Sequence, residues 1–335
     1  MMWRLTDLRL RLRPLLRRNR PEYASTISLI ACVVLAIGSI IIGAVEQSLL
    51  VQTNGYISLI DIGNSLLFLT AVQRSSRSAD VTFNYGYGKY ESLAILVSAN
   101  LLVVLGIFTI AEAFGLSTRF DSSGNTALLI VWSTLGFVTM RGMSRLLKRY
   151  SDRFHMPMLR YDAELWRVDS FVELGVIAEV CLVGVLLWFE LEEVALAVEV
   201  LASLALVAIT LRVPLRHGRD ALQQLLDRTL PDEMQYEILA VISENTARMC
   251  AFKSVHTRQS GKDIFIEIDL VMPYDYTLSQ LYVLERGMID KLHERFPTAI
   301  PRVYVTPCDG ACNHAGGTNC PVKALLAEPQ SAPSD

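Results

Sequence analysis

Charged residues and histidine are both scarce in this sequence. Of its 335 residues, 19% are charged, 52% are hydrophobic and five are histidine. The apolar residues gather in long runs instead of recurring at the period of an amphipathic helix or strand, which excludes an ordinary soluble protein. The composition therefore indicates a protein embedded in a membrane.

The sequence also lacks the motifs of several enzyme and secreted classes. GYGKYE at 86–91 lacks the Ser or Thr that ends a phosphate-binding loop, and no nucleophile elbow or hydrolase triad is visible. The six cysteines form no disulfide framework. The basic N-terminal stretch is too long for a signal peptide, and no small-residue cleavage site follows it. We therefore expect neither an enzyme nor a secreted protein.

Six apolar runs each approach the ~20 residues that a helix needs to cross a bilayer. They occupy 23–44, 50–72, 93–114, 126–146, 168–189 and 194–213. Seven arginines fall in the first twenty residues, a pattern more typical of a cytoplasmic flank at anionic lipid than of an arm that binds nucleic acid. Basic residues also concentrate between runs two and three and between runs four and five. This asymmetry predicts a multi-pass inner-membrane protein with both termini in the cytoplasm.

The composition changes after Pro214. A polar connecting helix that ends near Pro231 leads into a helical pattern (232–247), two strand patterns (250–258 and 264–272), a helix (277–296) and a last strand (302–306). We therefore predict an α-helical membrane protein with six transmembrane helices and a small α+β domain of αββαβ order. The expected parts are a basic N-terminal segment (1–22), a transmembrane domain (23–213), a connecting segment (214–230), a cytoplasmic domain (231–307) and a flexible cysteine-containing tail (308–335).

Carboxylates interrupt four of the apolar runs, and those of the second and fifth runs are the candidates for a site, whereas Glu112, Glu179 and Glu199 are expected near an interface or hydrogen-bonded between helices. A charged residue inside a membrane segment costs about 2.5–3.5 kcal/mol on insertion scales, so Asp61 is a functional candidate by default. Asn64 and Ser65 follow it within one helical turn. Further along the chain, spacings of seven and four place three acidic residues on one helical face: Asp162, Asp169 and Glu173.

These residues predict a metal site made of oxygen ligands. Asp61, Asp169 and Glu173 are the main candidates, and Ser65, Asn64 and Asp162 are the additional ones. Oxygen ligands suit Mn²⁺, Mg²⁺ or Fe²⁺ better than Zn²⁺, which favours nitrogen and sulfur. The alternative is that the carboxylates line a water-filled vestibule, or pair with Arg141 or Arg167, without binding metal.

The tail holds a second group of metal-ligand residue types. Cys308, Cys312, His314 and Cys320 have the composition of a Cys3His zinc site. Their spacing differs from zinc-finger and zinc-ribbon patterns, so a reduced, flexible tail without metal is the favoured alternative.

Several stretches in fixed order resemble the cation diffusion facilitator family, in particular its bacterial zinc and ferrous-iron efflux pumps. They are IDIGNSL (60–66), NYGYGKYESLA (84–94), LLDRTLPDE (225–233), HTRQSG (256–261) and FIEIDL (265–270). The resemblance covers roughly 23–308. It implies a ferredoxin-like cytoplasmic domain, a homodimer and export of divalent cations in exchange for protons. It also implies a transport site with two residues from the second span and two from the fifth.

The sequence departs from that family at all three expected metal sites. In the membrane, Ile57 and Leu165 stand where two ligands are expected. In the loop after the second span, Phe83 and Tyr87 stand at histidine positions beside Asp80. In the cytoplasmic domain, only Asp269 survives as a ligand, since the other positions are Lys253, Tyr304 and Thr306.

The leading hypothesis is a homodimeric transporter that exports divalent cations by proton antiport through a site of carboxylates alone. Its cargo would be manganese, iron, zinc or a similar ion, and no cofactor is expected to be tightly bound. Its other partners would be the lipid bilayer and protons. We expect no nucleic acid partner. The alternative is a transport-deficient family member that acts as a regulatory or structural metal-sensing partner in the membrane.

Overall fold

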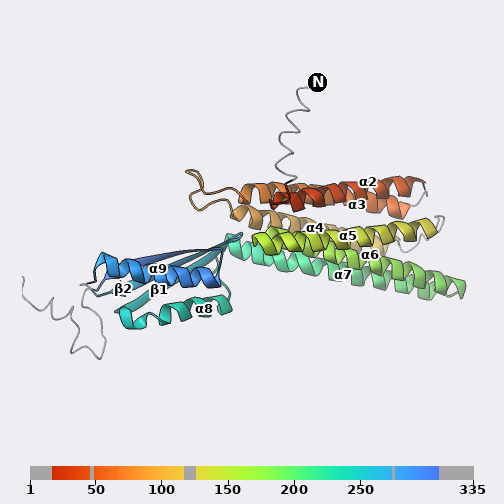
Figure 1. Ribbon diagram of the computed structural model, residues 1–335. Coiled ribbons are helices and arrows are strands. Elements are labelled where there is room, and N and C mark those ends of the chain that lie inside the picture. The colour runs from red at the N-terminus through yellow and green to blue at the C-terminus, as the bar shows by residue number, and fades with distance from the viewer. Residues whose placement is uncertain (1–16, 46–48, 117–125, 274–275, 309–335) are drawn as a thin grey trace, which may run out of the picture. The chain divides into compact units, whose positions relative to one another are not determined.

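The computed structural model describes residues 17–45, 49–116, 126–273 and 276–308 (Figure 1). The chain divides after Leu226 into two compact units, a helical unit and a mixed unit of helices and strands.

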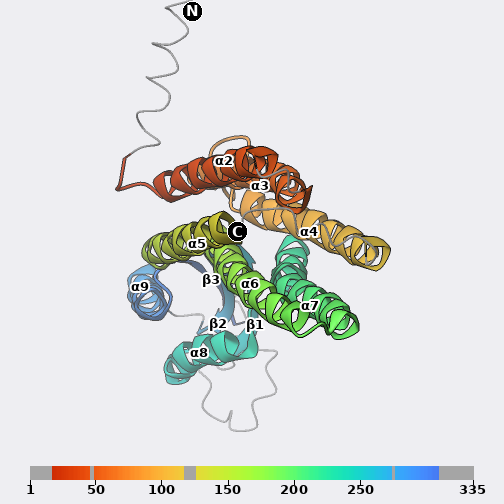
Figure 2. The ribbon, with the colours of Figure 1, turned by 90° about the vertical axis from the view of Figure 1, so that its right-hand side faces the viewer.

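Six long helices make up the described part of the helical unit, and they lie alongside one another (Figure 2). They are α2 (Glu22–Val45), α3 (Leu49–Ser75), α4 (Lys89–Leu116), α5 (Thr126–Phe154), α6 (Pro157–Trp188) and α7 (Glu192–Leu225). The closest packing joins α2 with α3, α5 with α6, and α4 with α7. Direct packing between α3 and α6 is sparse by comparison.

Each predicted apolar run falls within one of these helices, give or take a residue at the end. Within the described residues, two segments are long and apolar enough to cross a bilayer by length and hydropathy alone: Glu22–Ile42 in α2 and Lys89–Phe108 in α4. This measure does not confirm the expectation of six crossings. Large apolar side chains are nevertheless exposed on the outer surfaces of several helices, among them Ile41, Phe108, Val138 and Val185. Such surfaces favour a lipid environment over water.

Two helices extend well beyond the apolar runs predicted for them. α6 begins at Pro157, a residue type favoured at the first helical position, rather than near 168. Its early residues Met158, Leu159 and Tyr161 are fully buried, so this extension forms core rather than loop. α7 continues through Pro214 to Leu225, so the predicted connecting helix is continuous with the last apolar run and ends at Leu225 rather than near Pro231.

The second unit has the αββαβ order that the sequence predicts. Its elements are α8 (Asp232–Ser243), the one-turn helix η1 (Thr246–Arg248), β1 (Ala251–Ser260), β2 (Asp263–Met272), α9 (Leu278–Arg295) and β3 (Ala299–Pro307). Within the described residues, β2 lies centrally in the sheet, antiparallel to β1 and parallel to β3. Gly261, with φ at 60°, permits the tight β1–β2 turn.

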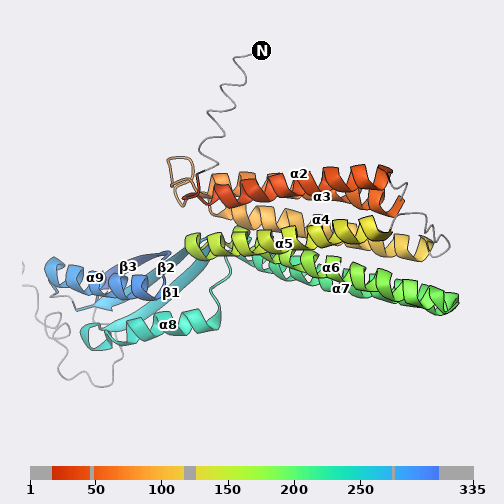
Figure 3. The ribbon, with the colours of Figure 1, turned by 45° about the vertical axis from the view of Figure 1, so that its right-hand side comes forward.

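The core of this unit lies between the sheet and its two helices (Figure 3). Alternate residues of β2, including Ile266, Ile268 and Leu270, are fully buried against Ile238 of α8 and Met288 of α9. From Ile266 to Met272 buried and partly exposed side chains alternate, so the other face of β2 carries Glu267, Asp269 and Val271, and Phe265 before this stretch is also buried.

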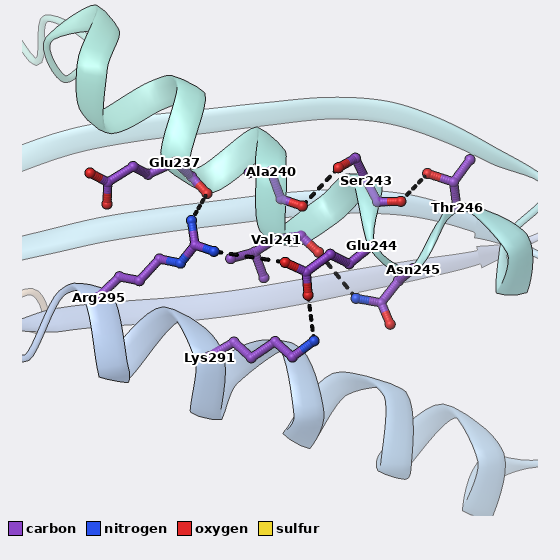
Figure 4. Close-up of polar contacts among 9 residues, drawn as sticks. All are labelled: Glu237, Ala240, Val241, Ser243, Glu244, Asn245, Thr246, Lys291 and Arg295. Atoms are coloured by element: carbon purple, nitrogen blue, oxygen red, sulfur yellow. Dashed lines mark hydrogen bonds and ion pairs between the residues drawn. The ribbon is translucent and has the colours of Figure 1, made fainter.

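Ion pairs join the end of α8 to α9 (Figure 4). Glu244 accepts a hydrogen bond from Lys291 and lies 3.7 Å from Arg295, which also donates to the Glu237 carbonyl. Thr277 and Gln280 begin α9 with a reciprocal capping box.

Candidate functional site

The two main candidate aspartates lie on different helices of the helical unit. Asp61 is half-buried on α3, and Asp169 is exposed on α6. Asp169 lies within electrostatic range of Asp61, Asp162 and Glu173. In the described part of the chain, neither Asp61 nor Asp169 accepts a hydrogen bond from a protein donor. The fold therefore gathers four carboxylates in one region and leaves two without protein donors.

This region is not a compact metal-binding cage. Across residues 17–45, 49–116, 126–273 and 276–308, no three His, Cys, Asp or Glu side chains converge closely enough to hold a metal ion.

Glu173 lies against α5. A methyl group added at Gly136 would meet its Oε1 atom at 3.8 Å, an ordinary contact distance, so the carboxylate lies beside this glycine. Along α6, Glu173 lies one turn beyond Asp169.

The two additional candidates on α3 have different environments. Ser65 shares a hydrogen bond with Cys32 of α2, and the two atoms are 3.1 Å apart. Asn64 is buried, and its Oδ1 atom has no hydrogen-bond partner among the described residues. The sequence did not predict the contact between Cys32 and Ser65, because nothing near a cysteine in an apolar run indicates which side chain of another helix it will meet.

Asp162 differs from Asp169 because protein donors hold it. Its Oδ2 atom accepts a hydrogen bond from the Ser28 hydroxyl at 3.1 Å, and all three side chains of this group, Ser28, Asp162 and Trp166, are buried. The Trp166 indole donates to the Ser28 oxygen at 2.8 Å. Nothing in the sequence pattern marks Ser28 or Trp166 as partners of Asp162.

Other polar contacts hold the first turns of α6. The buried Glu91 carboxylate of α4 accepts a hydrogen bond from the Met158 backbone at 3.1 Å, which satisfies a donor at the start of the helix. Glu164 pairs with His217 of α7 at 2.8 Å. Ser144 of α5 donates to the Ala163 carbonyl at 2.8 Å. The part of α6 that precedes Asp169 is therefore fixed from several sides.

The loop between α3 and α4 uses its only acidic residue internally. Asp80 accepts hydrogen bonds from the Tyr87 hydroxyl at 2.6 Å and from the backbone of Thr82 and Phe83 at 2.9 and 2.8 Å. The Tyr87 hydrogen bond is the main reason that the pKa of Asp80 is below its usual range. It also raises the pKa of Tyr87. The Phe83 and Tyr87 rings lie 4.5 Å apart, so aromatic packing stands where histidine ligands were expected.

The residues at the metal site expected in the cytoplasmic domain take part in the structure of the sheet. Lys253 is the extra residue of a bulge in β1, and Asp269 accepts a hydrogen bond from Ser254 at 2.6 Å. Tyr304 pairs with Asp269 across the β2–β3 ladder, and Thr306 donates to the Leu270 carbonyl at 3.3 Å.

Of the tail candidates, the structure describes only Cys308. Its side chain is buried, and its backbone N–H donates to the Met272 carbonyl at 2.8 Å. Cys312, His314 and Cys320 lie outside the described residues.

Two family models account for most of the chain. One, described as the cation efflux transmembrane domain, matches residues 25–226, and the other, described as the cation efflux protein cytoplasmic domain, matches residues 230–305. The chain belongs to the cation efflux, or cation diffusion facilitator, family. Members of this family are membrane-embedded transporters of metal cations rather than enzymes.

Named relatives agree with this assignment. The chain is 31% identical to the cation-efflux pump FieF of Serratia proteamaculans over 258 residues, which cover 75% of this chain and 81% of the relative. It is 29% identical to FieF of Yersinia pestis over 259 residues, with the same coverage. A solved structure of CzrB in its zinc form is 26% identical and covers 26% of this chain and 97% of its own, with a TM-score of 0.24 that is too low to compare folds.

Proposed function

We propose that this cation efflux family member exports divalent metal cations across the inner membrane in exchange for protons. The observation that carries the proposal is the pair Asp61 and Asp169, which lie within electrostatic range on separate helices and have no protein donor in the described residues. Carboxylates must lose their protons before they bind a cation, so one pair of groups can carry both ions in turn. Like charges held close together also favour uptake of either ion.

The proposed cycle requires α3 and α6 to approach and separate. The sparse direct packing between these helices supports a mobile contact there, whereas α3 is held by α2, and α6 by α5 and α7. Rocking of packed helix groups around a fixed site would open it alternately to the two sides of the membrane. Glu173, one turn beyond Asp169, would supply a third carboxylate to the cation.

The proposed cargo is a cation that accepts oxygen ligands. Asp61, Asp169 and Glu173 offer carboxylate oxygens, and Asn64 and Ser65 offer neutral ones. This ligand set favours Mn²⁺ or Fe²⁺ over Zn²⁺. The nearby Cys32 sulfur is engaged with Ser65 rather than free for a soft metal.

The proposed assembly is a homodimer that crosses the membrane six times, with both termini in the cytoplasm. The six long helices and the basic segments between apolar runs support this topology. The match of residues 230–305 to a family cytoplasmic domain that takes its name from a dimer supports the assembly.

Reconstituted vesicles test the proposed function. With an imposed pH gradient and Mn²⁺, Fe²⁺, Zn²⁺, Cd²⁺ or Mg²⁺ outside, the wild type should couple metal movement to proton movement, detected by a metal dye and a pH dye. Vesicles in which every metal leaves the proton flux at the protein-free level would refute it.

A second candidate is a regulatory partner without transport. It is favoured by one observation, which is that Asp80 and Asp269 at the two other expected sites are already bonded to Tyr87 and Ser254. The same vesicle measurement separates the two functions, because only a transporter moves metal.

A further inference from the structure

Helix α2 contacts both halves of the candidate site through two residues that are one turn apart. Ser28 donates to Asp162 of α6 at 3.1 Å, and Cys32 shares a hydrogen bond with Ser65 of α3 at 3.1 Å. Ser65 follows Asp61 by one turn of α3, and Asp162 precedes Asp169 by two turns of α6. One turn of α2 is therefore linked to both candidate aspartates.

We propose that Ser28 and Cys32 are positioning residues that set the separation of Asp61 and Asp169, and that Asp162 is their anchor on α6 rather than a cargo ligand. The inference rests on the proposed function, because it assumes that Asp61 and Asp169 hold the cation together. It adds three residues that touch no cargo themselves.

The packing of the helices gives this link its importance. α3 and α6 contact each other sparsely, whereas α2 packs closely along α3. The hydrogen bond from Ser28 to Asp162 thus joins the α2–α3 pair to the helix that carries Asp169. A buried hydrogen bond is costly to break, since both polar groups would remain without water.

The direction of the hydrogen bonds defines the role of each group. The Trp166 indole donates to the Ser28 oxygen, so the Ser28 hydrogen remains for donation to Asp162. Asp162 therefore accepts one hydrogen bond, through its Oδ2 atom. Asp169, in contrast, accepts no hydrogen bond from the described residues.

The same helix supplies a matched control. Ser39 of α2 is also buried, and it accepts a hydrogen bond from an indole, that of Trp132 in α5, at 3.2 Å. Ser28 and Ser39 are thus the same residue type on one helix with the same kind of partner. Ser39 has no hydrogen bond to any of the candidate carboxylates among the described residues.

The test is Mn²⁺-driven proton flux through full-length protein in vesicles, with KM and kcat measured per folded protein. Ser28→Ala should raise the KM for Mn²⁺ about tenfold, the size expected when one buried hydrogen bond is lost. Ser39→Ala should lower thermal stability as much as Ser28→Ala does and leave the KM for Mn²⁺ at the wild-type value. Cys32→Ala should raise KM by a smaller factor, and Cys32→Ser, which keeps a hydrogen-bonding group, should restore it.

Asp162 variants separate an anchor from a ligand. Asp162→Asn keeps an acceptor oxygen for Ser28, so its KM should lie closer to the wild type than that of Asp162→Ala. Asp162→Ala combined with Ser28→Ala should be no worse than Asp162→Ala alone, because both changes break the same hydrogen bond.

Three results would overturn the inference. They are a wild-type KM in Ser28→Ala, an equal rise in Ser39→Ala, and loss of transport in Asp162→Asn as complete as in Asp169→Asn. Failure of the proposed function is distinguishable, since wild-type flux in Asp169→Asn would refute that function whatever Ser28→Ala does.

Discussion

Asp61 and Asp169 in the helical bundle have surroundings opposite to those of Asp80 in the loop and Asp269 in the sheet. Asp80 accepts three hydrogen bonds within its loop, and Asp269 accepts one from the neighbouring strand. Asp61 and Asp169 accept none from the described residues, although they carry the same functional group. A carboxylate with protein donors stabilises local structure, whereas one without them retains its lone pairs for a proton or a metal ion. Bonding environment therefore separates structural carboxylates from candidate transport carboxylates.

The largest expected effect comes from removing the charge of either open aspartate. Asp61→Asn or Asp169→Asn should reduce metal-coupled proton flux by at least about a hundredfold, because a charged ligand and a proton carrier are lost together. Thermal stability should stay equal or rise, because a charge that is costly in a membrane segment disappears. Flux in vesicles and melting in detergent measure both. Wild-type flux in either variant would contradict the view that carboxylates without protein donors carry the transported ions.

An intermediate effect is expected at Glu173, the third candidate carboxylate, which lies against α5 beside Gly136. Glu173→Gln should lower Mn²⁺ transport about tenfold, since the amide keeps the shape but loses the charge. Gly136→Ala is the control, because the added methyl group would meet Glu173 at 3.8 Å, an ordinary contact distance, and should leave transport near the wild type.

Restoring a nitrogen ligand should change which metal ion is preferred rather than the overall rate of transport. Leu165→His places imidazole one turn before Asp169 and should shift selectivity from Mn²⁺ toward Zn²⁺. Initial rates for the two metals give the ratio. An unchanged ratio in both Glu173→Gln and Leu165→His would show that neither position faces the cargo.

A smaller effect is expected in the loop, where Asp80 is fully bonded. Its pKa in the folded loop is lowered, mainly by Tyr87, so its stabilising contribution is present above the unfolded pKa of about 4 and is lost as pH falls through the lower folded value. In Tyr87→Phe the contribution should be smaller and its loss should be complete at a higher pH, because the folded pKa rises toward the unfolded value, while transport at neutral pH should be unaffected. Proteolysis of the loop as a function of pH measures its stability, and metal-coupled proton flux in vesicles measures transport. An identical pH profile in the variant would mean that Tyr87 does not stabilise the loop.

The smallest effect is expected at the ion pairs of α8 and α9. Lys291 lowers the pKa of Glu244 through a hydrogen bond, but both side chains are exposed to water. Glu244→Gln should shift the melting temperature by no more than about 1 °C, because exposed ion pairs contribute little. A larger drop would show that this contact supports the whole domain.

Local patterns predicted much of the architecture. Apolar runs coincide with the six helices because a helix that faces lipid needs apolar side chains along its length. The strand patterns at 250–258 and 264–272 predicted β1 and β2 on either side of the turn at Gly261. The start of α6 was missed because its polar residues are buried by neighbouring helices, a cause that no local pattern records.

By itself, the sequence determined the family, the order of the elements and the identity of Asp61 and Asp169 as candidates, because these depend on residue types at short spacing. Only the tertiary structure decided which carboxylates accept hydrogen bonds from protein donors. Ser28 and Asp162 are 134 positions apart, and Glu91 and Met158 are 67 apart. The spacing of residues along a chain does not record which side chains meet across helices, since that depends on how the whole bundle packs.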